Sequence, residues 1–214
     1  MDYSLFINHF PSVCEWYWNR KWKESNVTFR MRSDSSKVSL VNTKLKEKLG
    51  YNFSLNIPLF TGGSVEKAYK CWDYVRHHIT YKSDKSLYGL NEHWETPEEV
   101  FNKREADCEG GAHLLMKLME HNNIPAWRRK LCAGWVLVNG KLEGHGYVIF
   151  LADDFEWYVL DWSYWPSMSK RCWLKTPHRK LDNFYDSIWF TFNEEKIWGE
   201  HDYVIGVEDG IYEK

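Results

Sequence analysis

The spacing of apolar residues changes along the chain from a helical pattern to a strand-like one. Between Ser64 and Ile79, apolar residues such as Val65, Trp72 and Val75 recur every three or four positions, which is typical of a helix with one buried face. Ser64 stands where such a helix would be capped. The sequence therefore predicts an amphipathic helix over residues 64–79.

Two capping patterns predict where the next helices begin. The segment from Thr96 to Glu99 combines a capping threonine, a proline suited to the first helical position and a glutamate that closes a capping box. Asp107 is the natural cap of the following helix, which puts Cys108 at its first position. That helix is predicted to run to about Asn122, where two asparagines and a nearby proline stop it.

From residue 126 onward the pattern predicts β-strands. Asn139-Gly140 separates two strand-like segments and is the strongest short-range signal for a hairpin. Further strands are predicted at 144–151, 156–160, 188–192 and 203–207. Helices followed by antiparallel strands favour the α+β class.

Residues 1–63 have weaker periodicity, with a short helix predicted at 44–49. Thr61-Gly62-Gly63 then interrupts the chain, as turn-forming residues do. We predict two units: an N-terminal extension of unknown role at 1–63, packed on the core, and a main domain at 64–214.

Composition and charge exclude several classes of protein. The 214 residues include 13 Trp, 13 Tyr and 11 Phe, and the formal net charge is −2. So many large rings supply a buried core, which excludes a disordered chain. The near-neutral charge argues against nucleic-acid binding, and no apolar run reaches the roughly 18 residues of a membrane span. Composition alone leaves open whether the tryptophans fill a core or line a cleft.

The five cysteines predict free thiols in a reducing setting. They stand at positions 14, 71, 108, 132 and 172 and include no C-x-x-C pair, so neither a disulfide framework nor a zinc ribbon is indicated. The first residues lack the basic region of a signal peptide. Both observations favour a cytoplasmic location.

Cys108 has the position of a reactive thiol. At a helix N-terminus, unsatisfied N–H groups and the helix dipole favour negative charge, which is expected to lower the pKa of the thiol. Gly110 and Gly111 follow in the first turn, where they weaken a helix but allow a substrate or a strand to approach closely. A buried helix cysteine is the alternative.

His145 is the candidate base. It lies between two glycines at the start of an apolar strand, where glycine suggests a bulge or a close approach. If the next turn is centred on Asp153, Ile149 opposes Trp157, and His145 opposes Asp161 on the same face. Asp161 could then orient the imidazole as the third group of a triad. A core histidine and a strand-ending aspartate are the alternatives.

Four segments together resemble the transglutaminase-like superfamily of cysteine enzymes. They are Trp94–Val100, Asp107–Gly110, Gly144–Gly146 and Leu160–Asp161. The resemblance covers about residues 64–165 and implies a papain-like α+β fold, with the cysteine helix packed against an antiparallel sheet. By position it implies Cys108 as nucleophile, His145 as general base and then acid, and Asp161 as the orienting residue, within a catalytic domain at 64–214.

The activity that this resemblance implies is acyl transfer through a Cys108 thioacyl intermediate, most simply hydrolysis of an amide, peptide or isopeptide bond in a protein or peptide-like substrate. The alternatives are a protein-glutamine transglutaminase or deamidase, and a catalytically inactive module that binds peptide or glycan. Trp94, Trp162 and Tyr81 are candidates for substrate or oxyanion contacts. No cofactor and no metal site are expected, because the nine histidines show no H-x-x-x-H or H-x-x-E spacing.

Three local expectations complete the sequence-based picture. Ala106 stands where the family usually has glycine, so a left-handed backbone there would be strained. His113 is expected to be exposed or capping. The basic run Arg128–Lys130 is expected to be a solvated strand edge.

Overall fold

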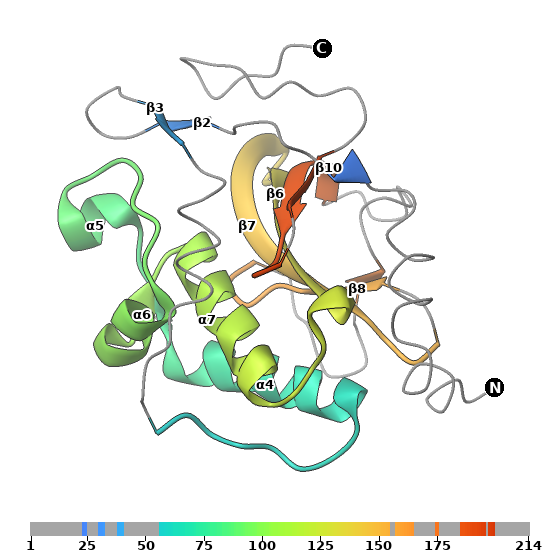
Figure 1. Ribbon diagram of the computed structural model, residues 1–214. Coiled ribbons are helices and arrows are strands. Elements are labelled where there is room, and N and C mark those ends of the chain that lie inside the picture. Colours follow the sequence, from blue (N-terminus) through green and yellow to red (C-terminus); the bar gives the residue numbers. More distant parts are fainter. Residues whose placement is uncertain are drawn as a thin grey trace.

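The computed structural model describes residues 23–24, 30–32, 38–40, 56–154, 157–164, 174–175, 185–195 and 197–199 (Figure 1). The helix expected at 44–49 and the strand expected at 203–207 lie outside these residues. The division of the chain at residue 63 stays a prediction.

Helix α7 (Cys108–His121) is the central helix. It packs against α4 (Ser64–His78), α6 (Pro97–Lys103) and the sheet strand β7 (Lys141–Leu151). A short helix, α5 (Asp84–Tyr88), precedes α6, and a 3₁₀ turn, η1 (Ala126–Arg128), leads into the sheet. Every residue of α7 from Glu109 to Met119 is buried, as expected for a helix between other helices and a sheet.

One antiparallel sheet has the strand order β1-β11-β10-β6-β7-β8-β9. The bounds of the other strands in this sheet are β1 Lys23–Glu24, β6 Arg129–Val138, β8 Trp157–Leu160, β9 Leu174–Lys175, β10 Tyr185–Phe192 and β11 Ile197–Gly199. Two small pairs complete the described strands: β2 (Arg30–Arg32) with β3 (Val38–Leu40), and β4 (Thr80–Tyr81) parallel to β5 (Glu105–Ala106). Helices and an antiparallel sheet confirm the α+β class.

The predicted local signals are largely present. The Thr96–Glu99 capping box forms in both directions, and Asp107 caps α7 by accepting a hydrogen bond from the Gly110 amide at 3.3 Å. The β6–β7 hairpin turns at Asn139-Gly140, where both residues have positive φ. At α4 the cap is Gly63, and Ser64 is the first helical residue.

The predicted register of β7 and β8 was wrong by two residues. Leu151, and not Ile149, pairs with Trp157, and Ile149 pairs with Val159. Because the side-chain period of a strand is two, this shift leaves every residue on its predicted face. The faces were therefore right although the direct partners were not.

The sheet buries apolar residues on both faces. Val148 and Phe150 of β7 pack in the core beneath the helices, whereas Tyr147, Ile149 and Leu151 belong to a second cluster. Successive side chains of this strand therefore pack into two apolar clusters, one on each face of the sheet.

Four of the described tryptophans are buried: Trp72, Trp127, Trp157 and Trp162. Trp135 is only half-buried.

The basic run at the start of β6 is buried, so its predicted role as a solvated edge was wrong. Arg128 donates to Asp153 Oδ1 at 2.7 Å, Arg129 pairs with Glu194, and Lys130 is fully buried. Strand β6 lies between β10 and β7, so these side chains need internal partners.

No helix among the described residues has the length and apolar character to cross a membrane.

Replacing Gly111 with Ser should destabilise the fold. A Cβ at Gly111 would lie 2.1 Å from Trp162 Cε2, so the indole or the helix must shift, at a cost of about 1–3 kcal/mol. Gly63→Ser is the matched control, because nothing lies within 4 Å of its added Cβ and serine suits that cap. Chemical denaturation should separate the two variants; equal midpoints would contradict the packing described here.

Candidate active site

Cys108 and His145 lie on one pocket of about 180 Å³. The lining residues are Tyr81, Cys108, Val136, Val138, Glu143, Gly144, His145, Ser163 and Tyr164. They come from β4, the N-terminus of α7, the β6–β7 hairpin and the segment that follows β8. The structure thus brings together two segments that the sequence separates by 37 residues.

His145 contacts Asp161, as the sequence predicted, although the two residues are not direct cross-strand partners. Nε2 of His145 lies 2.7 Å from Asp161 Oδ2. Strand β8 ends at Leu160, which pairs with Val148, so Asp161 reaches His145 diagonally. Diagonal neighbours on one face are within reach of long side chains. With Nε2 engaged, Nδ1 is the ring nitrogen left to exchange a proton with a thiol.

Asp161 is a fully buried carboxylate held by four donors. Besides His145, the amides of Ser163 and Tyr164 donate to Oδ1 at 3.1 and 3.0 Å, and the Tyr185 hydroxyl donates to Oδ2 at 2.8 Å. These bonds compensate the cost of burying the charge. Its backbone oxygen also accepts from Trp72 Nε1 at 2.6 Å, which ties the site to α4.

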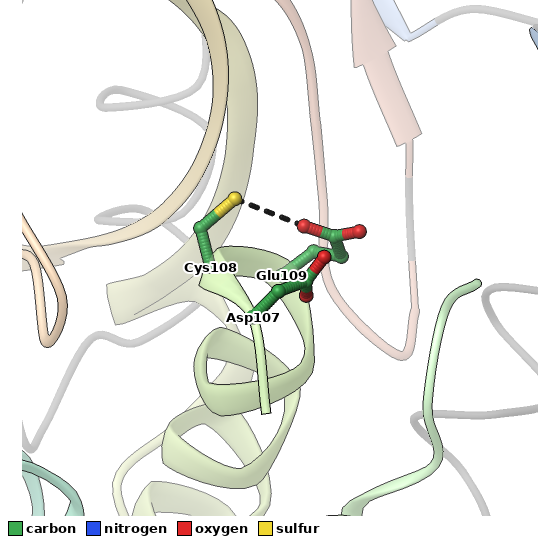
Figure 2. Close-up of side chains that lie close together, drawn as sticks. All are labelled: Asp107, Cys108 and Glu109. Atoms are coloured by element: carbon green, nitrogen blue, oxygen red, sulfur yellow. Dashed lines mark hydrogen bonds between the residues drawn. The ribbon is translucent and has the colours of Figure 1, made fainter. Parts of the chain in front are cut away.

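The Cys108 thiol points toward a carboxylate. Its Sγ donates to Glu109 Oε2 at 2.9 Å (Figure 2). Burial, followed by the charges of Glu109 and Asp107, raises the pKa of the thiol well above its ordinary value, while a backbone hydrogen bond from Gly146 acts in the opposite direction. The expected lowering of the thiol pKa was therefore wrong for this arrangement, because burial and, after it, two adjacent carboxyls raise that pKa.

Five carboxyl groups converge beside the thiol. They are Asp84, Glu92, Glu95, Asp107 and Glu109. Burial first, and then mutual repulsion, raises the pKa of Glu92 and of Glu95 to about 8 and that of Glu109 well above its usual value. Burial likewise raises the pKa of Asp107 to about 7. Histidine spacing gave no sign of this cluster, because its members are carboxylates that come from separate segments of the chain.

The cluster has the donors that a hard cation prefers. Carboxylate oxygens of Asp84, Glu95 and Asp107 lie within 4.8 Å of one another, as do those of Asp84, Glu92 and Glu109. Glu95 is fully buried, and its Oε2 has no hydrogen-bond partner, which is unusual for a buried oxygen. Oxygen-only ligands suit Ca²⁺ or Mg²⁺ rather than zinc.

The remaining predicted site residues divide between pocket and packing. Tyr81 lines the pocket. Trp162 is buried, and its Nε1 donates to the Cys108 carbonyl at 2.9 Å, so it anchors the start of α7. Trp94 lies outside the pocket lining, and its Nε1 donates to Glu92 Oε1 at 2.7 Å.

One local expectation was wrong, and the condition for a second is not met. His113 is fully buried, with Nδ1 2.8 Å from the Glu95 carbonyl, because the whole middle of α7 is enclosed. Ala106 lies in β5 without a positive φ, so alanine is unstrained there. Its strand pairs with Tyr81.

Comparisons with known proteins agree with this fold. The family model described as the transglutaminase-like superfamily matches residues 51–162. Among solved structures, Legionella pneumophila LapG is similar with 16% identity and a TM-score of 0.51, covering 73% of this chain and 74% of its own. An EGTA-treated form of LapG gives 17% identity and the same TM-score, covering 73% and 72%. These likenesses support the papain-like α+β fold. No curated protein sequence matches the chain.

The pH dependence of stability should reveal the buried Glu95. Its pKa is about 8 in the folded chain against an ordinary 4.5, so its favourable contribution is complete below about pH 4.5 and is lost as the pH rises through 8. With a chelator present, Glu95→Gln should melt near the wild type at pH 5 but on the order of 5 °C higher at pH 9. Glu98→Gln, outside the cluster, is the control. A constant difference at all pH values would contradict the raised pKa.

Proposed function

The chain belongs to the transglutaminase-like superfamily, and from this we propose that it is a cysteine-dependent acyl-transfer enzyme that hydrolyses an amide, peptide or isopeptide bond. The observation that carries the proposal is the pocket shared by Cys108 and His145, with Asp161 on the far nitrogen of the imidazole. This is the arrangement of nucleophile, base and orienting group that thiol acyl transfer requires.

In the first half-reaction, Nδ1 of His145 takes the proton of Cys108, and Sγ attacks the substrate carbonyl carbon. His145 then gives that proton to the leaving nitrogen, the C–N bond breaks, and a thioester remains on Cys108. Asp161 stabilises the imidazolium that forms in between. Because the thiol rests on Glu109, it must turn from that carboxyl toward His145 before attack.

In the second half-reaction, His145 removes a proton from water, whose oxygen attacks the thioester carbon. The C–S bond breaks, and His145 gives the proton to the sulfur, which releases the acid and restores the free thiol. The Cys108 amide at the start of α7 is one oxyanion donor. Tyr81 is a second candidate, because it lines the same pocket as Cys108 and its phenol can donate a hydrogen bond. Trp162 is not available for this role, since its N–H already bonds the Cys108 carbonyl.

Transfer to an amine is the principal alternative outcome, because the same thioester can be resolved by an amine instead of water. An inactive binding module would keep the pocket without forming the thioester. Measuring how one acyl group is attached to Cys108 and then released distinguishes both alternatives from hydrolysis.

Acetylation with p-nitrophenyl acetate should test the thioester. The wild type should release p-nitrophenol in a burst and carry one acetyl group on Cys108, read by peptide mass spectrometry, and Cys108→Ala should show neither. His145→Ala should slow the burst about a hundredfold or more. His121→Ala, an exposed histidine at the other end of α7, should react normally.

Adding a primary amine to the acetylated enzyme should leave the rate of deacylation and the product unchanged if water is the acceptor. An amide product would favour the transferase. If Cys108 of the wild type carries no acetyl group, and Cys71 and Cys132 are likewise unmodified, the proposal that the chain is a cysteine-dependent enzyme is contradicted.

A second candidate function is the binding of a divalent cation by the carboxylate cluster. It is favoured by the unpartnered Glu95 Oε2 and by the convergence of oxygens on one small volume. Asp84, Glu95 and Asp107 would hold the ion, with Glu92 and Glu109 adjoining. The ion would neutralise carboxylates beside the thiol. Ca²⁺ suits a many-oxygen, irregular site better than Mg²⁺, which prefers to keep its waters.

Calcium should therefore stabilise the chain. At a hundredfold excess over Kd, the free energy of unfolding should rise by about 2.7 kcal/mol, measured by denaturation with CaCl₂ against EGTA. Glu95→Gln should lose most of this increase, and Glu98→Gln should keep it. An equal response of both variants, or none in the wild type, would contradict a site at the cluster.

A further inference from the structure

We propose that Tyr185 is a positioning residue that fixes the Asp161 carboxylate for His145. The proposal rests on the proposed acyl-transfer function and adds to it a residue 24 positions beyond the aspartate. None of the motifs that indicated the triad includes this tyrosine.

The Tyr185 hydroxyl and the His145 ring share one oxygen. The phenol donates to Asp161 Oδ2 at 2.8 Å, and His145 Nε2 lies 2.7 Å from the same atom. The phenol lies 3.4 Å from the Tyr164 carbonyl, but its single proton favours the nearer, charged acceptor. Tyr185 is 1% exposed, so water does not readily replace its hydroxyl.

Asp161 needs such support because it lies just beyond the end of β8. Its Oδ1 is held by the amides of Ser163 and Tyr164, a local turn that its own segment provides. Oδ2 has no local donor among these bonds. The two donors on Oδ2 come from other strands, β7 and β10, and together they prevent the carboxylate from rotating about its Cβ–Cγ bond.

Ring contacts give Tyr185 a defined place beside the histidine. It packs against Tyr147 at 4.7 Å and against Tyr164 at 6.5 Å between ring centroids. These two rings in turn flank His145 at 6.0 and 5.7 Å. The phenol is therefore held by packing as well as by its hydrogen bond, which is what positioning a neighbouring group requires.

The test is Tyr185→Phe, which removes the hydroxyl and keeps the ring. The rate constant of the burst with p-nitrophenyl acetate should fall about tenfold. The loss should appear in this rate constant and leave KM nearly unchanged. The downfield proton resonance of the His145 Nε2–H···Asp161 bond should shift or broaden. Tyr158→Phe is the matched control, because its hydroxyl donates to Asp154 and Tyr158 does not line the pocket.

If Tyr185→Phe unfolds, 3-fluorotyrosine at position 185 keeps the packing and alters the acidity of the phenol. The same resonance should then move, and an unmoved resonance would overturn the proposal. A wild-type rate together with an unchanged resonance in Tyr185→Phe would overturn it as well. If the wild type is not acetylated at all, the proposed function fails, and the resonance alone still decides whether Tyr185 positions Asp161.

Discussion

The close approach of the first turn of α7 to its neighbours is the constraint on which the site depends. A Cβ at Gly110 would lie 2.1 Å from Glu95 Oε2, one at Gly111 2.1 Å from Trp162, and one at Gly146 3.0 Å from the Glu109 backbone. No side chain fits these gaps without movement. The thiol meets the His145 strand because the backbones there can touch, and the same contact buries the carboxylates.

The close packing around α7 conflicts with the surroundings that a reactive thiol favours. A nucleophilic thiol benefits from positive surroundings, yet Cys108 lies between Asp107 and Glu109 and donates to the latter. The histidine side of the pocket is the opposite case, since every oxygen of the Asp161 carboxylate has donors. The site thus supplies hydrogen-bond donors around Asp161 and His145 and leaves the carboxyls beside Cys108 without a neutralising charge among the described residues, so any change that activates the thiol belongs to the cysteine side.

Features carried by short-range signals could be predicted from the sequence. The caps at Thr96 and Asp107 and the hairpin at Asn139-Gly140 depend on neighbouring residues only, and all three formed. The β7–β8 register could not be predicted, because its turn lacks a dipeptide of defined geometry. Only the face of the sheet on which each side chain lies was predicted correctly. Long-range features stayed hidden: the carboxylates gather from separate loops, and the buried His113 has polar character that gives no sign of its enclosure.

The position of β10 in the sheet has a consequence for how the molecule is made. Strands β6, β7 and β8 follow one another in the chain and can pair as soon as each is synthesised, but β10 returns to the open side of β6. Until residues 185–192 leave the ribosome, β6 presents a row of unpaired backbone groups, and the pocket lacks the strand that carries Tyr185. Cys108, His145 and Asp161 are all present in that shorter nascent chain. The sheet beside these three residues therefore becomes complete only after residues 185–192 have been synthesised.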